Sequence, residues 1–110
     1  MLEPVTCIDP DFFHDLFAAD LPTRQTKVMA AGQRPAALNA LGEPSGPPAW
    51  RTIPSCYLIA RDDHAIPPPA ERAMAARAHA HTVEIASSHV AMMSHPSTVT
   101  DLVLAAARNR

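Results

Sequence analysis

The clearest apolar pattern lies in the second half of the chain. Residues 56–60, Cys-Tyr-Leu-Ile-Ala, form an unbroken apolar run of strand length, which is typical of a strand covered on both faces. Residues 82–86 form a second short strand pattern, rich in β-branched side chains. Between the two strands, Pro67 and Pro68 open an alanine-rich helical pattern that extends to about Ala80.

A last helix is predicted after the second strand. Ser97 is its predicted N-cap, and its apolar stripe consists of Val99, Leu102, Val103 and Ala106. The order of elements is strand, helix, strand, helix, and the crossover is long enough to join parallel strands. The second half therefore predicts an α/β fold with a parallel sheet.

The first half of the chain carries helical patterns instead. Asp9 is a predicted N-cap, with Pro10 at the first helical position. A second helical segment starts at Leu21-Pro22, and a third runs from Pro35 to a C-terminal cap at Gly42. The first of these helices has an apolar face formed by Phe12, Phe13, Leu16 and Phe17.

Proline and glycine mark a boundary between the two halves. Residues 43–54 are rich in proline and include a glycine, a composition that favours a loop. The sequence thus divides into a helical segment, residues 1–46, and an α/β part, residues 47–110.

Composition excludes several functions. Nine Lys+Arg against eleven Asp+Glu give a net charge of −2, with no basic stripe for nucleic acid or an anionic membrane to bind. The three glycines are isolated, so GxGxxG, P-loop and GxSxG motifs are all absent from the sequence. No cofactor is expected. Two cysteines form no secretory disulfide framework, Cys56 is expected to be a buried thiol, and a soluble cytoplasmic protein is favoured.

An acid and a histidine follow the two predicted strands. Asp63 and His89 each lie just beyond a strand end, where open parallel sheets place their ligands. Adjacent parallel strands are roughly 4.8 Å apart, so loops that leave neighbouring ends can bring these side chains together. A histidine that acts as a general base needs a carboxylate on its other ring nitrogen, and Asp63 is the predicted partner. Asp62 is the nearby alternative.

Other histidines and methionines are read as structural. His79 and His81 suggest a metal pair by residue type, but no further ligands complete a site, and a solvated helix end is favoured. His95 is expected to order the turn before a proline. Met92 and Met93 are expected in the core or in a pocket wall. Phe12, Phe13, Phe17 and Trp50 are read as packing residues, with an acyl-pocket lining as the alternative.

At these residues the sequence resembles a known family. Residues 50–107 look like the C-terminal end of small, ester-cleaving α/β-hydrolases. In that pattern the catalytic acid is followed three and four positions later by an aliphatic residue and a proline, as Asp63 is by Ile66 and Pro67. Ser88-His89 and His95-Pro96 resemble the family's histidine loop, in which the first histidine is catalytic. Residues 8–46 resemble its helical cap.

The resemblance implies a C-terminal piece of an α/β-hydrolase sheet preceded by a helical cap segment. The triad of this family runs as serine, acid, histidine, and the serine elbow is expected upstream of Met1. Family members commonly carry glycine where this chain has Ala60, and often where it has Ser88.

The implied parent activity is serine-dependent hydrolysis of a small ester or related substrate. His89 would be the base and Asp63 would orient it, while this chain supplies no nucleophile. The alternative is a non-enzymatic truncated product, or a subunit that completes the sheet of a protein partner. A third reading keeps the fold but changes the chemistry to that of a lyase or a haloacid-type enzyme.

Overall fold

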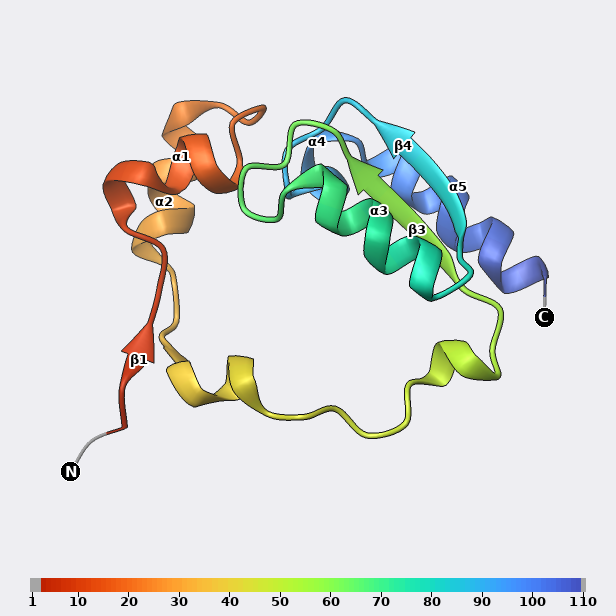
Figure 1. The fold of residues 1–110 in the computed structure, drawn as a ribbon. Coiled ribbons are helices and arrows are strands. Elements are labelled where there is room, and N and C mark those ends of the chain that lie inside the picture. Colours follow the sequence, from red (N-terminus) through yellow and green to blue (C-terminus); the bar gives the residue numbers. More distant parts are fainter. Residues whose placement is uncertain (1–2, 110) are drawn as a thin grey trace.

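The C-terminal half is a small α/β unit built on two parallel strands. The structure, a computed structural model, describes residues 3–109. The strands pair in register from Cys56 with His81 to Ala60 with Ile85. Figure 1 shows the order of elements, which is β3 (Cys56–Ala60), α3 (Pro68–Arg77), β4 (His81–Ile85), α4 (Ala91–Ser94) and α5 (Pro96–Arg108). The predicted strand–helix–strand–helix order and the parallel pairing are confirmed.

The core of this unit is concentrated at one end of β3. Both α3 and α5 contact β3, and Ala75 of α3 is fully buried. Ile59 and Ala60 are buried, whereas residues 56–58 are only half-buried. The prediction that this strand is covered on both faces therefore holds only at its carboxyl end, which is the end that carries the site. Cys56, expected as a buried thiol, is half-buried and free.

The outer strand, β4, has the character of a sheet edge. His81, Thr82 and Glu84 are exposed, and Glu84 forms an ion pair with Arg72 of α3. Exposed charged side chains are a common feature of edge strands, because they oppose pairing with further chains.

The N-terminal half contains two helices that pack against each other. These are α1 (Pro10–Phe17) and α2 (Thr23–Ala31). Asp9 caps α1 as predicted, because its carboxylate accepts a hydrogen bond from the backbone N–H of Asp11 at 2.9 Å. A two-residue ladder, which the sequence did not predict, joins β1 (Val5–Thr6) to β2 (Ala36–Ala37).

Three local predictions were wrong. No α-helix starts at Pro35, because residues 36–37 are extended and pair with β1, and only a 3-10 helix, η1 (Leu38–Gly42), follows. Ser97 does not cap α5, because Pro96 already occupies the first helical position and His95 is the cap residue, without a side-chain hydrogen bond. The apolar residues left open to solvent against expectation include Phe12, Leu16, Val103, Met92 and Met93.

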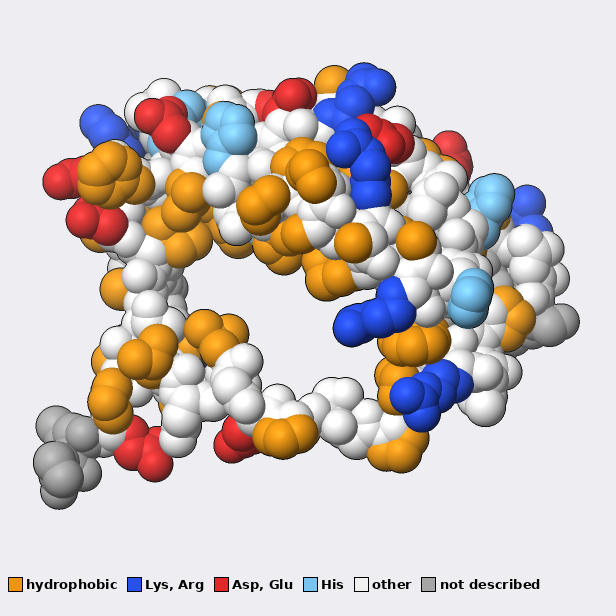
Figure 2. Space-filling model, in the orientation of Figure 1, with side chains coloured by type: hydrophobic (Ala, Val, Ile, Leu, Met, Phe, Trp, Pro, Cys, Tyr) orange, Lys and Arg blue, Asp and Glu red, His pale blue; other side chains and the backbone are white. Residues whose placement is uncertain are grey.

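The two halves meet at a small apolar cluster beside the histidine loop. Ala18 and Leu21, from the turn between α1 and α2, pack with Val90, and Phe17 and Met29 lie against them. Residues 43–55, which include the short 3-10 helix η2 (Ala49–Arg51), run as a connection away from this junction (Figure 1). The two halves are thus held together at this small cluster. The connection encloses an open space, which is visible in Figure 2.

The chain is expanded for its length. Its radius of gyration is 15.8 Å, whereas about 13 Å is expected for a compact domain of this size. The accessible surface is 8068 Å² for a mass of 11.8 kDa, against about 5,900 Å² for a compact monomer. Apolar side chains cover much of the surface that faces the open space (Figure 2). Over residues 3–109, no helix is long and apolar enough to cross a membrane.

Candidate active site

The acid loop presents Asp63 from the end of β3. The chain turns after Ala60, and the Asp63 N–H donates a hydrogen bond to the Ala60 carbonyl at 3.3 Å. The Asp63 Oδ1 atom accepts hydrogen bonds from the backbone N–H groups of Ala65 and Ile66, at 2.8 and 2.9 Å. Asp63 is 3% exposed, so its second oxygen, Oδ2, is held in a fixed direction inside the protein.

The histidine loop leaves β4 at the same edge of the sheet. Backbone pairing continues beyond the strands, because the Arg61 N–H donates to the Ile85 carbonyl and the Asp62 N–H donates to the Ser87 carbonyl, at 2.9 and 3.1 Å. These two bonds keep the acid loop and the histidine loop side by side as far as His89.

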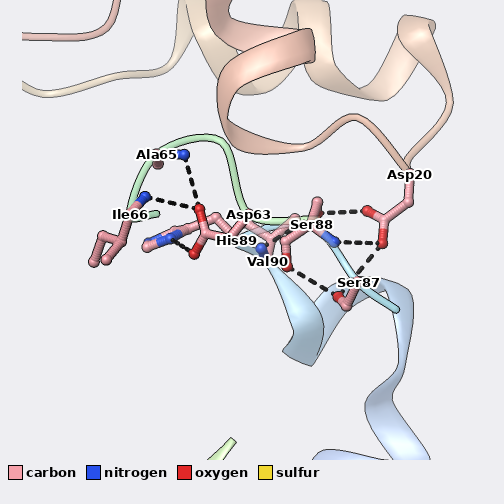
Figure 3. Close-up of polar contacts among 8 residues, drawn as sticks. All are labelled: Asp20, Asp63, Ala65, Ile66, Ser87, Ser88, His89 and Val90. Carbon is pink, nitrogen blue, oxygen red and sulfur yellow. Dashed lines mark hydrogen bonds and ion pairs between the residues drawn. The ribbon is translucent and has the colours of Figure 1, made fainter. Parts of the chain in front are cut away.

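Asp63 and His89 are in direct contact. The Nδ1 atom of His89 lies 2.8 Å from Oδ2 of Asp63 (Figure 3). The expectation that parallel strands bring this carboxylate and this imidazole together is confirmed. Asp62 is exposed and makes no side-chain contact with the histidine within the described part of the chain.

The contact decides which ring nitrogen is available for chemistry. A carboxylate only accepts hydrogen bonds, so Nδ1 of His89 carries a proton, and in the neutral imidazole Nε2 is the nitrogen with the lone pair. Nε2 forms no hydrogen bond within residues 3–109, and the His89 side chain is 31% exposed. The ring of Phe17 lies against the imidazole, with centroids 4.9 Å apart and planes tilted by 35°. The arrangement can accept a proton at Nε2 from a hydroxyl or a water molecule.

A second polar network holds the residues just before His89. The carboxylate of Asp20 accepts hydrogen bonds from the backbone N–H and the side chain of Ser88, and from the side chain of Ser87 (Figure 3). Burial alone would raise the pKa of Asp20, but its hydrogen bonds, first those from Ser88 and then those from Ser94 and the backbone, together outweigh burial and lower the pKa below its ordinary value. The sequence did not reveal this network, because Asp20 is far from the serines along the chain and belongs to no motif.

Glu71 is a buried carboxyl group behind the acid loop that the sequence also did not reveal. It lies in the first turn of α3, is 6% exposed, and its Oε2 atom has no hydrogen-bond partner within residues 3–109. Burial raises the pKa of Glu71, and the negative charge of Asp63 raises it further. Burial, with Glu71 and Asp63, likewise raises the pKa of Tyr57. The buried surroundings of Asp63 thus favour the protonated forms of Glu71 and Tyr57.

The remaining histidines lie outside the Asp63–His89 contact. The Nδ1 atom of His95 is 3.0 Å from the Ser94 hydroxyl and 3.9 Å from Asp20, in keeping with a role in ordering its turn. His79, at the end of α3, has a positive φ of 50°. Within residues 3–109 no group of three or more His, Cys, Asp or Glu side chains converges as a metal site would require.

An open apolar pocket of about 500 Å³ lies beside the acid loop. Phe12 and Leu16 of α1 form one wall, and His64 forms another, with its Nδ1 atom 2.8 Å from the Asp15 carbonyl. Of the aromatic residues considered for an acyl pocket, only Phe12 lines this one. Phe13 is buried, Phe17 lies on His89, and Trp50 lies near Arg51 and Arg77.

Comparison with known proteins bears on the family and the fold of this chain. The model of the alpha/beta hydrolase family matches residues 3–102, which is most of the chain. No curated protein and no solved structure shows significant similarity to it. The chain therefore belongs to the α/β-hydrolase family, and it has the α/β architecture of a small parallel sheet with flanking helices.

The raised pKa of Glu71 gives a prediction for stability against pH. Because folding raises this pKa, the folded state favours the protonated acid, so stability is full below the unfolded-state value and is lost as the pH rises through the folded-state value. Glu71→Gln keeps the shape without the charge. Amide protection in α3 should therefore increase at pH 7.5, by about tenfold for each unit of pKa shift, and should not change at pH 4.

Hydrogen exchange followed by NMR measures this effect, with protection factors corrected for the intrinsic rate at each pH. The matched control is Glu43→Gln in the exposed connection, which should leave α3 unchanged at both values. Equal protection in Glu71→Gln and the parent at pH 7.5 would show that folding does not raise the pKa of Glu71.

Proposed function

We propose that this chain supplies the acid and the base of a serine hydrolase that cleaves a small ester or a related substrate. The observation that supports this most directly is the 2.8 Å contact between Asp63 Oδ2 and His89 Nδ1. It leaves Nε2 with a lone pair at the carboxyl edge of a parallel sheet, where an α/β-hydrolase keeps its triad.

The proposed reaction proceeds by acyl transfer. His89 Nε2 takes the proton from a serine hydroxyl while the serine oxygen attacks the ester carbonyl, and Asp63 stabilises the imidazolium that forms. The imidazolium then gives the proton to the leaving alkoxide as the C–O bond breaks, leaving an acyl-serine. Water, deprotonated by His89 in the same way, releases the carboxylic acid and restores the serine.

The serines of this chain are not suited to be the nucleophile. Ser87 and Ser88 are buried, and both hydroxyls lie within hydrogen-bonding distance of the Asp20 carboxylate. None of the six serines in the sequence has the glycine flanks of an elbow. Within residues 3–109, no serine hydroxyl forms a hydrogen bond with His89. The proposal therefore assigns the nucleophile to an elbow-bearing segment of other sequence.

The free edge of β3 is the proposed place for that segment. β3 is flanked by α3 and α5 and carries the buried end of the sheet, as an interior strand does, whereas β4 carries the exposed charges of an edge. The chain exposes roughly 2,000 Å² more surface than a compact monomer of its mass, which is comparable to one side of a large permanent interface. A neighbouring core strand would cover part of this surface.

Substitution of the acid and the base tests the proposed roles. When a segment that carries a GxSxG elbow is joined in frame ahead of residue 1, the joined protein should hydrolyse p-nitrophenyl acetate. His89→Ala and Asp63→Asn should each lower kcat by about 10⁴-fold, because the first removes the base and the second favours the wrong tautomer. Asp62→Asn is the matched control, since this exposed neighbour does not contact the imidazole, and it should retain activity. Unchanged turnover in His89→Ala would remove His89 from the mechanism.

A non-enzymatic subunit that completes the sheet of a protein partner is the second candidate, and the exposed apolar surface favours it. The chain by itself should elute from size exclusion as an expanded or self-associated species and should bind a dye that reports exposed apolar surface. A compact monomer with a cooperative thermal transition by circular dichroism and no dye binding would contradict both this candidate and the need for an added core segment.

A further inference from the structure

The turn between α1 and α2 is joined to the histidine loop by hydrogen bonds to a single carboxylate. Asp20 Oδ1 accepts from the Ser88 hydroxyl at 2.5 Å, and Asp20 Oδ2 accepts from the Ser88 N–H at 3.0 Å and from the Ser87 hydroxyl at 3.4 Å. Figure 3 shows the carboxylate facing the backbone immediately before His89. Both oxygens are therefore committed to the segment that presents the imidazole.

Apolar contacts from the same turn reach His89 from its other sides. Ala18 is fully buried and packs with Leu21 against Val90, the residue after the histidine. The Phe17 ring lies 4.9 Å from the imidazole centroid. The turn thus holds the residue before His89, the residue after it and the ring itself. The loop is also bonded to the acid loop through the Ser87 carbonyl and to Ser94 through the Ser87 hydroxyl, but Asp20 supplies its hydrogen bonds to the N-terminal helical segment.

The geometry points to Asp20 as a positioning residue that fixes the backbone of His89. The imidazole is thereby kept within reach of Asp63. The helical segment and the proposed base then move as one unit. The inference rests on the proposed function, since a base must be positioned only if it acts as one. A carboxylate suits this task because its two oxygens can accept the Ser88 N–H and the Ser88 hydroxyl at the same time. An aspartate is ionised at neutral pH at its ordinary pKa, and hydrogen bonds to Asp20 lower its pKa further.

Substitution of Asp20 by asparagine tests whether the carboxylate, and not the volume of the side chain, positions His89. Asp20→Asn removes the negative charge and one acceptor oxygen, so the Ser88 N–H bonds to a neutral carbonyl and the Ser88 hydroxyl must turn to accept from the NH₂ group. Asp20→Glu retains both acceptors on a longer side chain. Ser88→Ala removes only the hydroxyl and leaves the backbone N–H bonded to Oδ2. Asp101→Asn on α5, whose carboxylate lies outside this network, is the matched control.

NMR of the full chain provides readouts that do not depend on hydrolysis. The first is the exchange rate of the Ser88 amide, and the second is the exchange rate of the His89 Nδ1–H proton, which the bond to Asp63 protects. In Asp20→Asn both rates should rise at least about tenfold, because a hydrogen bond to a charged acceptor is lost. Asp20→Glu should restore part of the protection, Ser88→Ala should give a smaller increase, and Asp101→Asn should match the parent.

Two outcomes would overturn the role of Asp20. One is unchanged exchange of the His89 ring proton in Asp20→Asn, and the other, if that variant does not fold, is unchanged exchange of this proton in Ser88→Ala. Failure of the proposed function looks different. In that case the protein joined to the elbow-bearing segment still hydrolyses the ester after His89→Ala, while the exchange rates still rise in Asp20→Asn.

Discussion

Parallel pairing of β3 with β4 is the constraint on which the site depends. The register ends with Ala60 beside Ile85, and backbone hydrogen bonds from Arg61 and Asp62 extend it into the loops. Because both strands run in the same direction, their carboxyl ends emerge at one edge, and each needs only a short loop to present a side chain there. The contact between Asp63 and His89 follows from this topology, although the two residues are 26 positions apart.

Asp63 is held more tightly than His89. Asp63 is buried and bonded to two backbone N–H groups, so its free oxygen has one direction in which to bind. His89 is partly exposed, and its loop relies on groups from the N-terminal helices: the Phe17 ring on its face, and the Asp20 carboxylate on Ser88. The N-terminal helices therefore contribute direct contacts to the imidazole and to the residue before it.

The large exposed apolar surface follows from the small size of the β3–β4 sheet. Two strands with two flanking helices bury only a short stretch of β3, and alanine-rich helices add little apolar area to that core. The expanded radius, the exposed apolar side chains and the free edge of β3 all describe a unit whose interior is incomplete on one side. These features support the proposal that a nucleophile and an adjoining strand come from other sequence.

Local pattern determined the elements in the second half and the two residues at their ends. The apolar run of residues 56–60 matches β3, the second strand is displaced by one residue, and the Asp63 spacing to Ile66 and Pro67 located the acid. Pattern also determined the Asp9 cap, which is a local hydrogen bond. It did not determine the extended pairing of residues 36–37, because that depends on β1 more than thirty residues earlier. Only the tertiary structure decided the bonds from Asp20 to Ser88 and the burial of Glu71 behind Asp63. Each of these features forms where segments that are distant along the chain pack together. Local residue spacing does not determine which polar groups meet there.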